Sequence, residues 1–163
     1  MKFLKKLTIL IYLISLKHVY AADVEISGTQ ATREDLQASS TLTISGTLDG
    51  DLNNIVRGYI AAGNEIDSAT VVVESGGTIQ GKSNAIMGRE TDSLTVINSG
   101  TIEATSSKAI QLLDAQNATI TNKSGGTIFA NTNAIVQQSA GTEDAENTTI
   151  TNAGTIYSVN DRA

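Results

Sequence analysis

The sequence has no cysteine, proline or tryptophan, and only two phenylalanines, four tyrosines and one histidine among its 163 residues. Without cysteine, neither a disulfide framework nor a zinc site with thiolate ligands can form. The scarcity of large aromatic side chains argues against the bulky core of a compact α/β enzyme. The chain is instead rich in glycine, threonine, serine, asparagine and isoleucine. Small and β-branched residues of this kind suit short strands joined by tight turns.

Residues 1–21 have the pattern of a secretory signal peptide. Three lysines near the start precede an apolar run over residues 7–16. This run is too short to span a bilayer, which needs about 20 apolar residues. Val19 and Ala21 then supply the small residues expected at positions −3 and −1 of a signal-peptidase site. We therefore expect cleavage after Ala21 and export through the inner membrane.

Removing this leader makes the chain strongly acidic. It takes away four of the eleven Lys and Arg residues and none of the seventeen Asp and Glu residues, so the net charge falls from −6 to −10. Nucleic acids and anionic lipids bind basic faces, so neither is expected as a partner. His18, the only histidine, also leaves. The mature chain then has no Ser-His-Asp or Cys-His nucleophile system and none of the commonest zinc or copper sites.

A repeat of about 25 residues organises the remainder of the chain. The string Gly-Thr-Ile or Gly-Thr-Leu begins at Gly46, Gly77, Gly100, Gly126 and Gly154. Alternating apolar and polar residues surround each copy, and Gly, Ser, Asn and Asp separate the runs, which is typical of short strands with turns between them. A unit of three strands and three turns has no interior of its own and must stack on copies of itself. The sequence therefore predicts an all-β, right-handed parallel β-helix of about five coils over residues 41–163. Residues 22–40 would form an N-terminal cap or lead-in, in which Thr32–Ser40 could make one helical turn.

Stacking of the coils predicts columns of equivalent residues in the interior. Three aliphatic columns are expected: Leu42, Val71, Val96, Ile120 and Ile150; Leu48, Ile79, Ile102, Ile128 and Ile156; and Ile55, Ile86, Ile110 and Ile135. A fourth column changes from aliphatic to amide, in the order Ile44, Val73, Asn98, Asn122 and Asn152. Stacked asparagines can satisfy one another's buried amides. We interpret Asn98, Asn122 and Asn152 as a structural ladder rather than a ligand site.

No other group of residues predicts a catalytic, cofactor or metal site. Asp49, Asp51 and Asn53 resemble the opening of a calcium loop, but Ile60 stands where an EF-hand needs its bidentate Glu. Other acidic residues are scattered across the repeat or fall in the loop over residues 139–147, where solvated charge is the usual role. That loop and residues 57–68 are insertions at the same corner of the coil. They are either tolerated variation in loop length or a recognition surface.

The repeats resemble those of bacterial autotransporter (type V secretion) passenger domains and of haemagglutinin-like β-helix exoproteins. The stretches that carry this resemblance are "VINSGTIEATSSKAIQLL", "ITNKSGGTIFANTNAIVQQ" and "ITNAGTIYS". The resemblance implies an exported β-helix at the cell surface or outer membrane of a Gram-negative bacterium, or outside the cell, often acting in adhesion. Its partner would be an unknown surface ligand, on a host or a carbohydrate surface. In that family a C-terminal outer-membrane β-barrel follows the passenger, and this sequence has no run of amphipathic strands that would form one.

The sequence leaves three functions open. The first is a non-catalytic display or adhesion protein of this family, and the second is a carbohydrate-active β-helix enzyme. The third is a non-functional fragment. Aligned on Gly154, the last copy places Ala163 one residue before the next core isoleucine. We therefore expect the repeats to be incomplete at the C-terminus.

Overall fold

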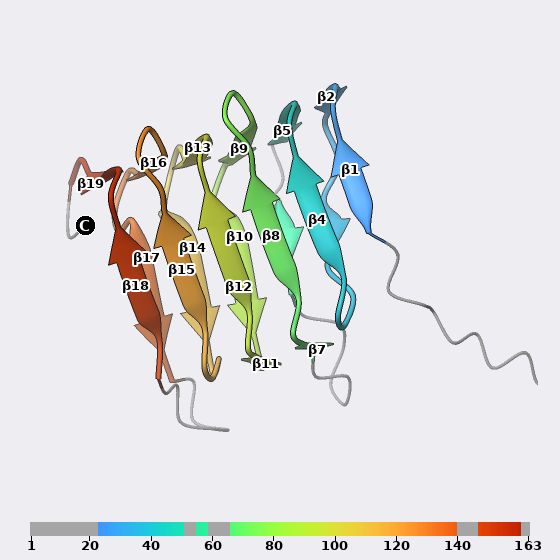
Figure 1. Ribbon diagram of the computed structural model, residues 1–163. Coiled ribbons are helices and arrows are strands. Elements are labelled where there is room, and N and C mark those ends of the chain that lie inside the picture. Colours follow the sequence, from blue (N-terminus) through green and yellow to red (C-terminus); the bar gives the residue numbers. More distant parts are fainter. Residues whose placement is uncertain (1–22, 51–54, 59–65, 140–146, 161–163) are drawn as a thin grey trace, which may run out of the picture.

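The computed structural model describes residues 23–50, 55–58, 66–139 and 147–160, and in these residues the chain winds into a parallel β-solenoid. Every regular element in this part is a strand. Figure 1 shows the coils stacked side by side, with one sheet facing the viewer and a second behind it. The predicted all-β parallel β-helix of about five coils is confirmed. The predicted signal peptide lies outside the described residues, as do Arg162 and Ala163.

Three long sheets form the walls of the solenoid. In spatial order, sheet A contains β1 (Val24–Ile26), β4 (Thr41–Ile44), β8 (Thr70–Val73), β12 (Thr95–Asn98), β15 (Thr119–Asn122) and β18 (Thr149–Asn152). Sheet B contains β19 (Thr155–Ser158), β16 (Thr127–Ala130), β13 (Thr101–Ala104), β9 (Thr78–Gly81), β5 (Thr47–Gly50) and β2 (Thr29–Gln30). Sheet C contains β17 (Ile135–Gln138), β14 (Lys108–Leu113), β10 (Asn84–Arg89), β6 (Val56–Arg57) and β3 (Glu34–Asp35). A short pair, β7 (Ile66–Asp67) and β11 (Thr91–Asp92), lies at the corner between sheets C and A.

The path of the chain gives the solenoid its hand. In Figure 1 the chain rises along sheet A at the front, crosses the top through sheet B and descends at the back along sheet C. Each circuit moves it from the blue end towards the red end, which makes the helix right-handed. Parallel strands joined by crossovers take this hand almost without exception, because the right-handed twist of the strands favours it.

The interior is built from columns, as the repeat alignment predicts. The first two aliphatic columns are in the predicted register throughout. The third is correct from Ile86 to Ile135, but Val56, not Ile55, pairs with Ile86. Ile55 and Val56 are both fully buried, as are Ala85 and Ala109 beside Ile86 and Ile110. Two consecutive inward residues at this corner allow a one-residue slip without exposing an apolar side chain, so hydrophobicity alone did not settle the register.

Residues 24–35 already belong to the solenoid. Val24 pairs with Leu42, Thr29 with Thr47 and Glu34 with Val56, so this segment supplies the first coil. The sequence allowed one helical turn within Thr32–Ser40, but the structure has no helix there, and Glu34–Asp35 forms strand β3. Backbone pairing with the next coil outweighs the weak helical preference of a short polar segment.

Two corners of the coil carry backbone conformations that the sequence did not reveal. Ser39, Ser68, Ser93, Asn117 and Asn147 each lie two residues before a strand of sheet A and have φ between 51° and 59°. Glu90 and Asp114, at equivalent positions after β10 and β14, also have positive φ. This left-handed region is uncommon for residues other than glycine, and of these only Asn and Asp favour it. The chain reverses direction at these corners without using glycine.

The glycine of each Gly-Thr-Ile string lies against the preceding coil. A Cβ atom on Gly100 would stand 2.2 Å from the carbonyl oxygen of Gly77 and 2.4 Å from that of Glu74. That oxygen of Gly77 accepts a hydrogen bond from the Thr101 amide at 2.9 Å, so it cannot move away without breaking the ladder between coils. At Gly28, in the first coil, a Cβ atom would have no other atom within 4 Å.

We predict that Gly100→Ala lowers the free energy of unfolding by about 1–3 kcal/mol, because the new methyl group overlaps backbone that is held in place. Gly28→Ala is the matched control and should leave it unchanged or slightly raised. The midpoint of urea unfolding, followed by circular dichroism, measures both. Equal midpoints for the two variants would contradict the proposed contact.

Candidate functional site

The asparagine column forms a continuous chain of side-chain hydrogen bonds. Asn98 Nδ2 donates to Asn122 Oδ1 at 2.8 Å, and Asn122 Nδ2 donates to Asn152 Oδ1 at 2.9 Å. The strands place them in register, with Ile44 and Val73 in the same column of earlier coils. Asn98 and Asn122 are fully buried, whereas Asn152 is exposed.

These amides also hold the turns between sheets A and B. Asn98 Oδ1 accepts a hydrogen bond from the Gly100 amide at 3.2 Å, and Asn152 Oδ1 accepts one from the Gly154 amide at 3.1 Å. An acceptor two residues before its donor is the pattern of an Asx turn. Asn122 precedes a longer turn and instead donates to the Gly126 carbonyl at 3.2 Å. The ladder thus satisfies buried backbone groups as well as its own amides.

Burial limits what the ladder can contact. The side chains of Asn98 and Asn122 have no exposed surface, so in the folded coil they are out of reach of a ligand. The sequon Asn122-Lys123-Ser124 has its acceptor amide in the core, where an enzyme that attaches glycans cannot reach it. Asn117 and Asn147, which begin two further sequons, lie exposed at a corner instead.

A second amide ladder, absent from the sequence predictions, runs along sheet C. Asn84 Nδ2 donates to Gln111 Oε1 at 2.9 Å, and Gln111 Nε2 donates to Gln138 Oε1 at 3.1 Å. The backbone pairs Asn84 with Lys108 and Gln111 with Val136, so these side chains reach diagonally between columns. A repeat alignment compares residues within a column, and it therefore could not find them.

Two of the carboxylates share a column on the outer face of sheet B, although the sequence suggested scattered acidic residues. This column reads Asp49, Gln80, Glu103, Phe129 and Tyr157. The Phe129 and Tyr157 rings stack with their centroids 4.7 Å apart. Beside the first two members, a shallow hollow of about 180 Å³ is lined by Asp49, Gly50, Gln80, Gly81, Lys82 and Thr105. Glu103 is not part of this lining.

This arrangement offers little to acid–base chemistry. Cleavage of a glycosidic bond normally uses two carboxylates on either side of it, and the described lining of the hollow supplies one, Asp49. Among the described residues, no three His, Cys, Asp or Glu side chains are grouped so that they could hold a metal ion. Asp51 and Asn53 of the calcium-like stretch lie outside the described residues. Glu74 is exposed in the turn after β8, and Asp114 is buried at the corner after β14.

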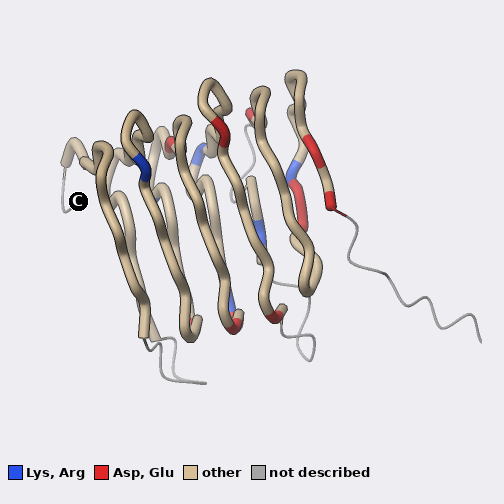
Figure 2. Tube along the Cα trace, viewed as in Figure 1, with Lys and Arg blue, Asp and Glu red and all other residues tan. Residues whose placement is uncertain are grey.

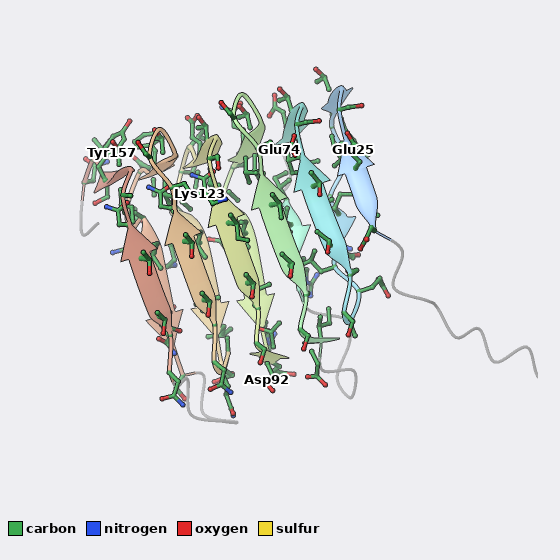
Figure 3. All side chains as sticks on the ribbon, viewed as in Figure 1. Glu25, Glu74, Asp92, Lys123 and Tyr157 are labelled. Atoms are coloured by element: carbon green, nitrogen blue, oxygen red, sulfur yellow. The ribbon has the colours of Figure 1, made fainter. Side chains whose placement is uncertain are left out.

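The outer face of sheet A carries no charged side chain from β4 to β18. One outward column is threonine in all five strands: Thr41, Thr70, Thr95, Thr119 and Thr149. Its neighbour reads Thr43, Val72, Ile97, Thr121 and Thr151. Figure 2 shows this face in tan, with charged residues on β1 and in the turns at its ends. In Figure 3, Glu74 and Lys123 stand in the upper turns, Asp92 at the lower corner and Glu25 on β1.

No known protein family matches this chain, and no curated protein or solved structure is significantly similar to it. In the part of the chain that the structure describes, no helix is long and apolar enough to cross a membrane.

We predict that Asn122→Val lowers the free energy of unfolding by about 1–3 kcal/mol, because it leaves buried hydrogen-bond partners without their amide. Valine fits this place, since Val73 occupies the same column before a turn of the same length. Thr121→Val is the control on the outer side of the same strand, where Val72 is the equivalent residue. Urea unfolding of the two variants gives the comparison, and a Thr121→Val chain as unstable as Asn122→Val would refute the role of the ladder.

Proposed function

We propose that this chain is the exported, cell-surface β-helix passenger of an autotransporter-like protein, with a structural display or adhesion role and no catalytic activity. The leader pattern of residues 1–21, the autotransporter-like repeats and the right-handed parallel solenoid support this proposal together. A solenoid alone serves several kinds of function, so the proposal depends on the combination.

The observation that carries the proposal is the regularity of the scaffold combined with the place of its insertions. The described strands keep their register from coil to coil in sheets A and B. The two longest connections, which follow β6 and β17, both begin where a strand of sheet C ends. A rigid stack with variable segments at one corner suits display, because the scaffold fixes where each segment emerges. Contacts made by several such segments would be weak individually and stronger together.

A carbohydrate-active enzyme is the alternative. It is favoured by Asp49 and Glu103, which share the outer column of sheet B near the hollow. Among the described residues that line the hollow, Asp49 is the only carboxylate, and this makes the alternative weaker than display.

We predict that a Gram-negative host expressing the full chain with a C-terminal epitope tag exports it and cleaves it after Ala21. Mass spectrometry of the periplasmic, medium and surface fractions measures the cleavage. Leu10→Arg should keep the chain unprocessed in the cytoplasm, because a charge interrupts the apolar run, whereas Leu10→Val should be exported normally. Unprocessed wild-type chain in the cytoplasm would contradict the proposal.

The absence of catalysis needs its own measurement. The exported chain should bind to beads coated with polysaccharide or with matrix protein. Incubated with acidic polysaccharides, it should release no new reducing ends and no unsaturated products. If the wild-type chain turns over such a polysaccharide and the rate falls in the Asp49→Asn variant, the enzymatic role would replace the display role.

A further inference from the structure

The uncharged outer face of sheet A has the properties of a surface that orders water. Its two columns place β-branched side chains at a strand spacing of about 4.8 Å in one direction and about 6.6 Å along each strand. Eight of its ten members are threonine, and the other two, Val72 and Ile97, have the same branched shape at Cβ. The result is a two-dimensional lattice of methyl groups, with a hydroxyl group at every position except Val72 and Ile97.

The hydroxyl groups of this face are available. Within the described part of the chain, none of its eight threonine hydroxyls donates to or accepts from another protein group. A threonine hydroxyl offers one donor and two acceptor sites, so each can hold a water molecule. Threonine side chains have few χ1 rotamers. Four of the five strands, β4, β8, β12 and β15, are paired on both sides, which keeps the spacing constant. Water held on such an array loses little additional order on joining a lattice, because the protein has positioned it already.

The absence of charge on this face contrasts with the rest of the molecule. The mature chain has a net charge of −10, yet the charged residues nearest to this face stand at its edges. They are Asp23, whose carboxylate accepts a hydrogen bond from the Thr41 amide, and Glu25, Glu74, Lys123 and Asp92 (Figures 2 and 3). Charged groups bind water in oriented shells that do not fit a neutral crystal lattice. A field of ten uncharged residues in an acidic protein therefore fits a neutral ligand with a repeating structure.

The size and composition of the face argue against the other obvious occupants. Five strands of four residues present about 300 Å². A stable protein–protein interface buries about 800 Å² on each partner, so a second copy of this chain would not be held. The face has no aromatic ring on which a sugar could stack and no amide or carboxylate that could pair with sugar hydroxyls. Ice fits this face better, because its oxygen atoms repeat at distances comparable to those of the threonine array.

We propose that the outer face of sheet A, formed by the outward residues of β4, β8, β12, β15 and β18, binds ice through water held on its threonine lattice. The face lies on the strands of sheet A, whereas the insertions begin where strands of sheet C end. Ice binding and the display role proposed above can therefore be tested separately.

The test uses the fluorescently labelled full chain and measures its partition into a slowly growing ice hemisphere. Wild type should be enriched in the ice, whereas Thr95→Lys with Thr119→Lys should lower its ice content at least tenfold, since two charges then stand in the middle of the lattice. The matched control is Thr101→Lys with Thr127→Lys. These two threonines lie in adjacent strands of sheet B and are also in register, but their neighbouring column is Glu103 and Phe129. This control should partition as wild type does.

Unfolding midpoints of both double variants show whether each is folded, and two folded variants make the comparison decisive. Wild type that stays in the liquid with a labelled albumin would overturn the proposal. Equal loss of ice content in the sheet A and sheet B variants would overturn it as well. Binding to microcrystalline cellulose or chitin that depends on Thr95 and Thr119, with no enrichment in ice, would assign the face to a polysaccharide lattice instead.

Discussion

Backbone hydrogen bonding between successive coils is the interaction on which the rest of this structure depends. Each coil is too thin to enclose a core, so its strands gain partners only by pairing in parallel with the coils on either side. Pairing in register places every residue above its equivalent, about 4.8 Å away. The side chain at each position of the repeat therefore packs against the side chains at the same position in the neighbouring coils. An aliphatic residue gains a column of aliphatic neighbours, and the buried amides of Asn98 and Asn122 each bond to the equivalent amide of the next coil.

This stacking of equivalent residues selects the interior side chains in two ways, through their bonding and through their size. Leucine, isoleucine and valine fill three columns, while the fourth changes to asparagine once three consecutive coils can provide it. Asparagine is suited to such a column because its side chain has both a donor and an acceptor, so one amide can serve the coil before and the coil after. The glycine column obeys the same geometry for a steric reason. The carbonyl of the preceding coil lies where a Cβ atom would stand, and that carbonyl accepts the bond that joins the coils.

The exterior has the same regularity without the same demand for burial, so it is free to differ from face to face. From β4 to β18, sheet A presents threonines without charge. Sheet B changes from acidic to aromatic along its length, and sheet C carries an amide ladder. A solenoid with three such faces, and with insertions at one corner, can present several surfaces from a single rigid body. The proposed display role and the proposed ice-binding face use different parts of that body.

The sequence by itself determined the repeat, the parallel β-helix and most columns, because residues such as Gly100, Ile102 and Asn98 recur at positions that only stacking explains. It also placed Asn98, Asn122 and Asn152 in one column. Only the tertiary structure decided the pairing of Val56 with Ile86, the strand at Glu34–Asp35 and the left-handed corners at Ser68 and Ser93. These features depend on backbone geometry imposed by the neighbouring coil, and serine, glutamate or a valine next to an isoleucine carries no local signal for it. The side-chain contacts between different columns, such as Asn84 with Gln111, were decided there too, because they depend on distances across the coil rather than on position within it.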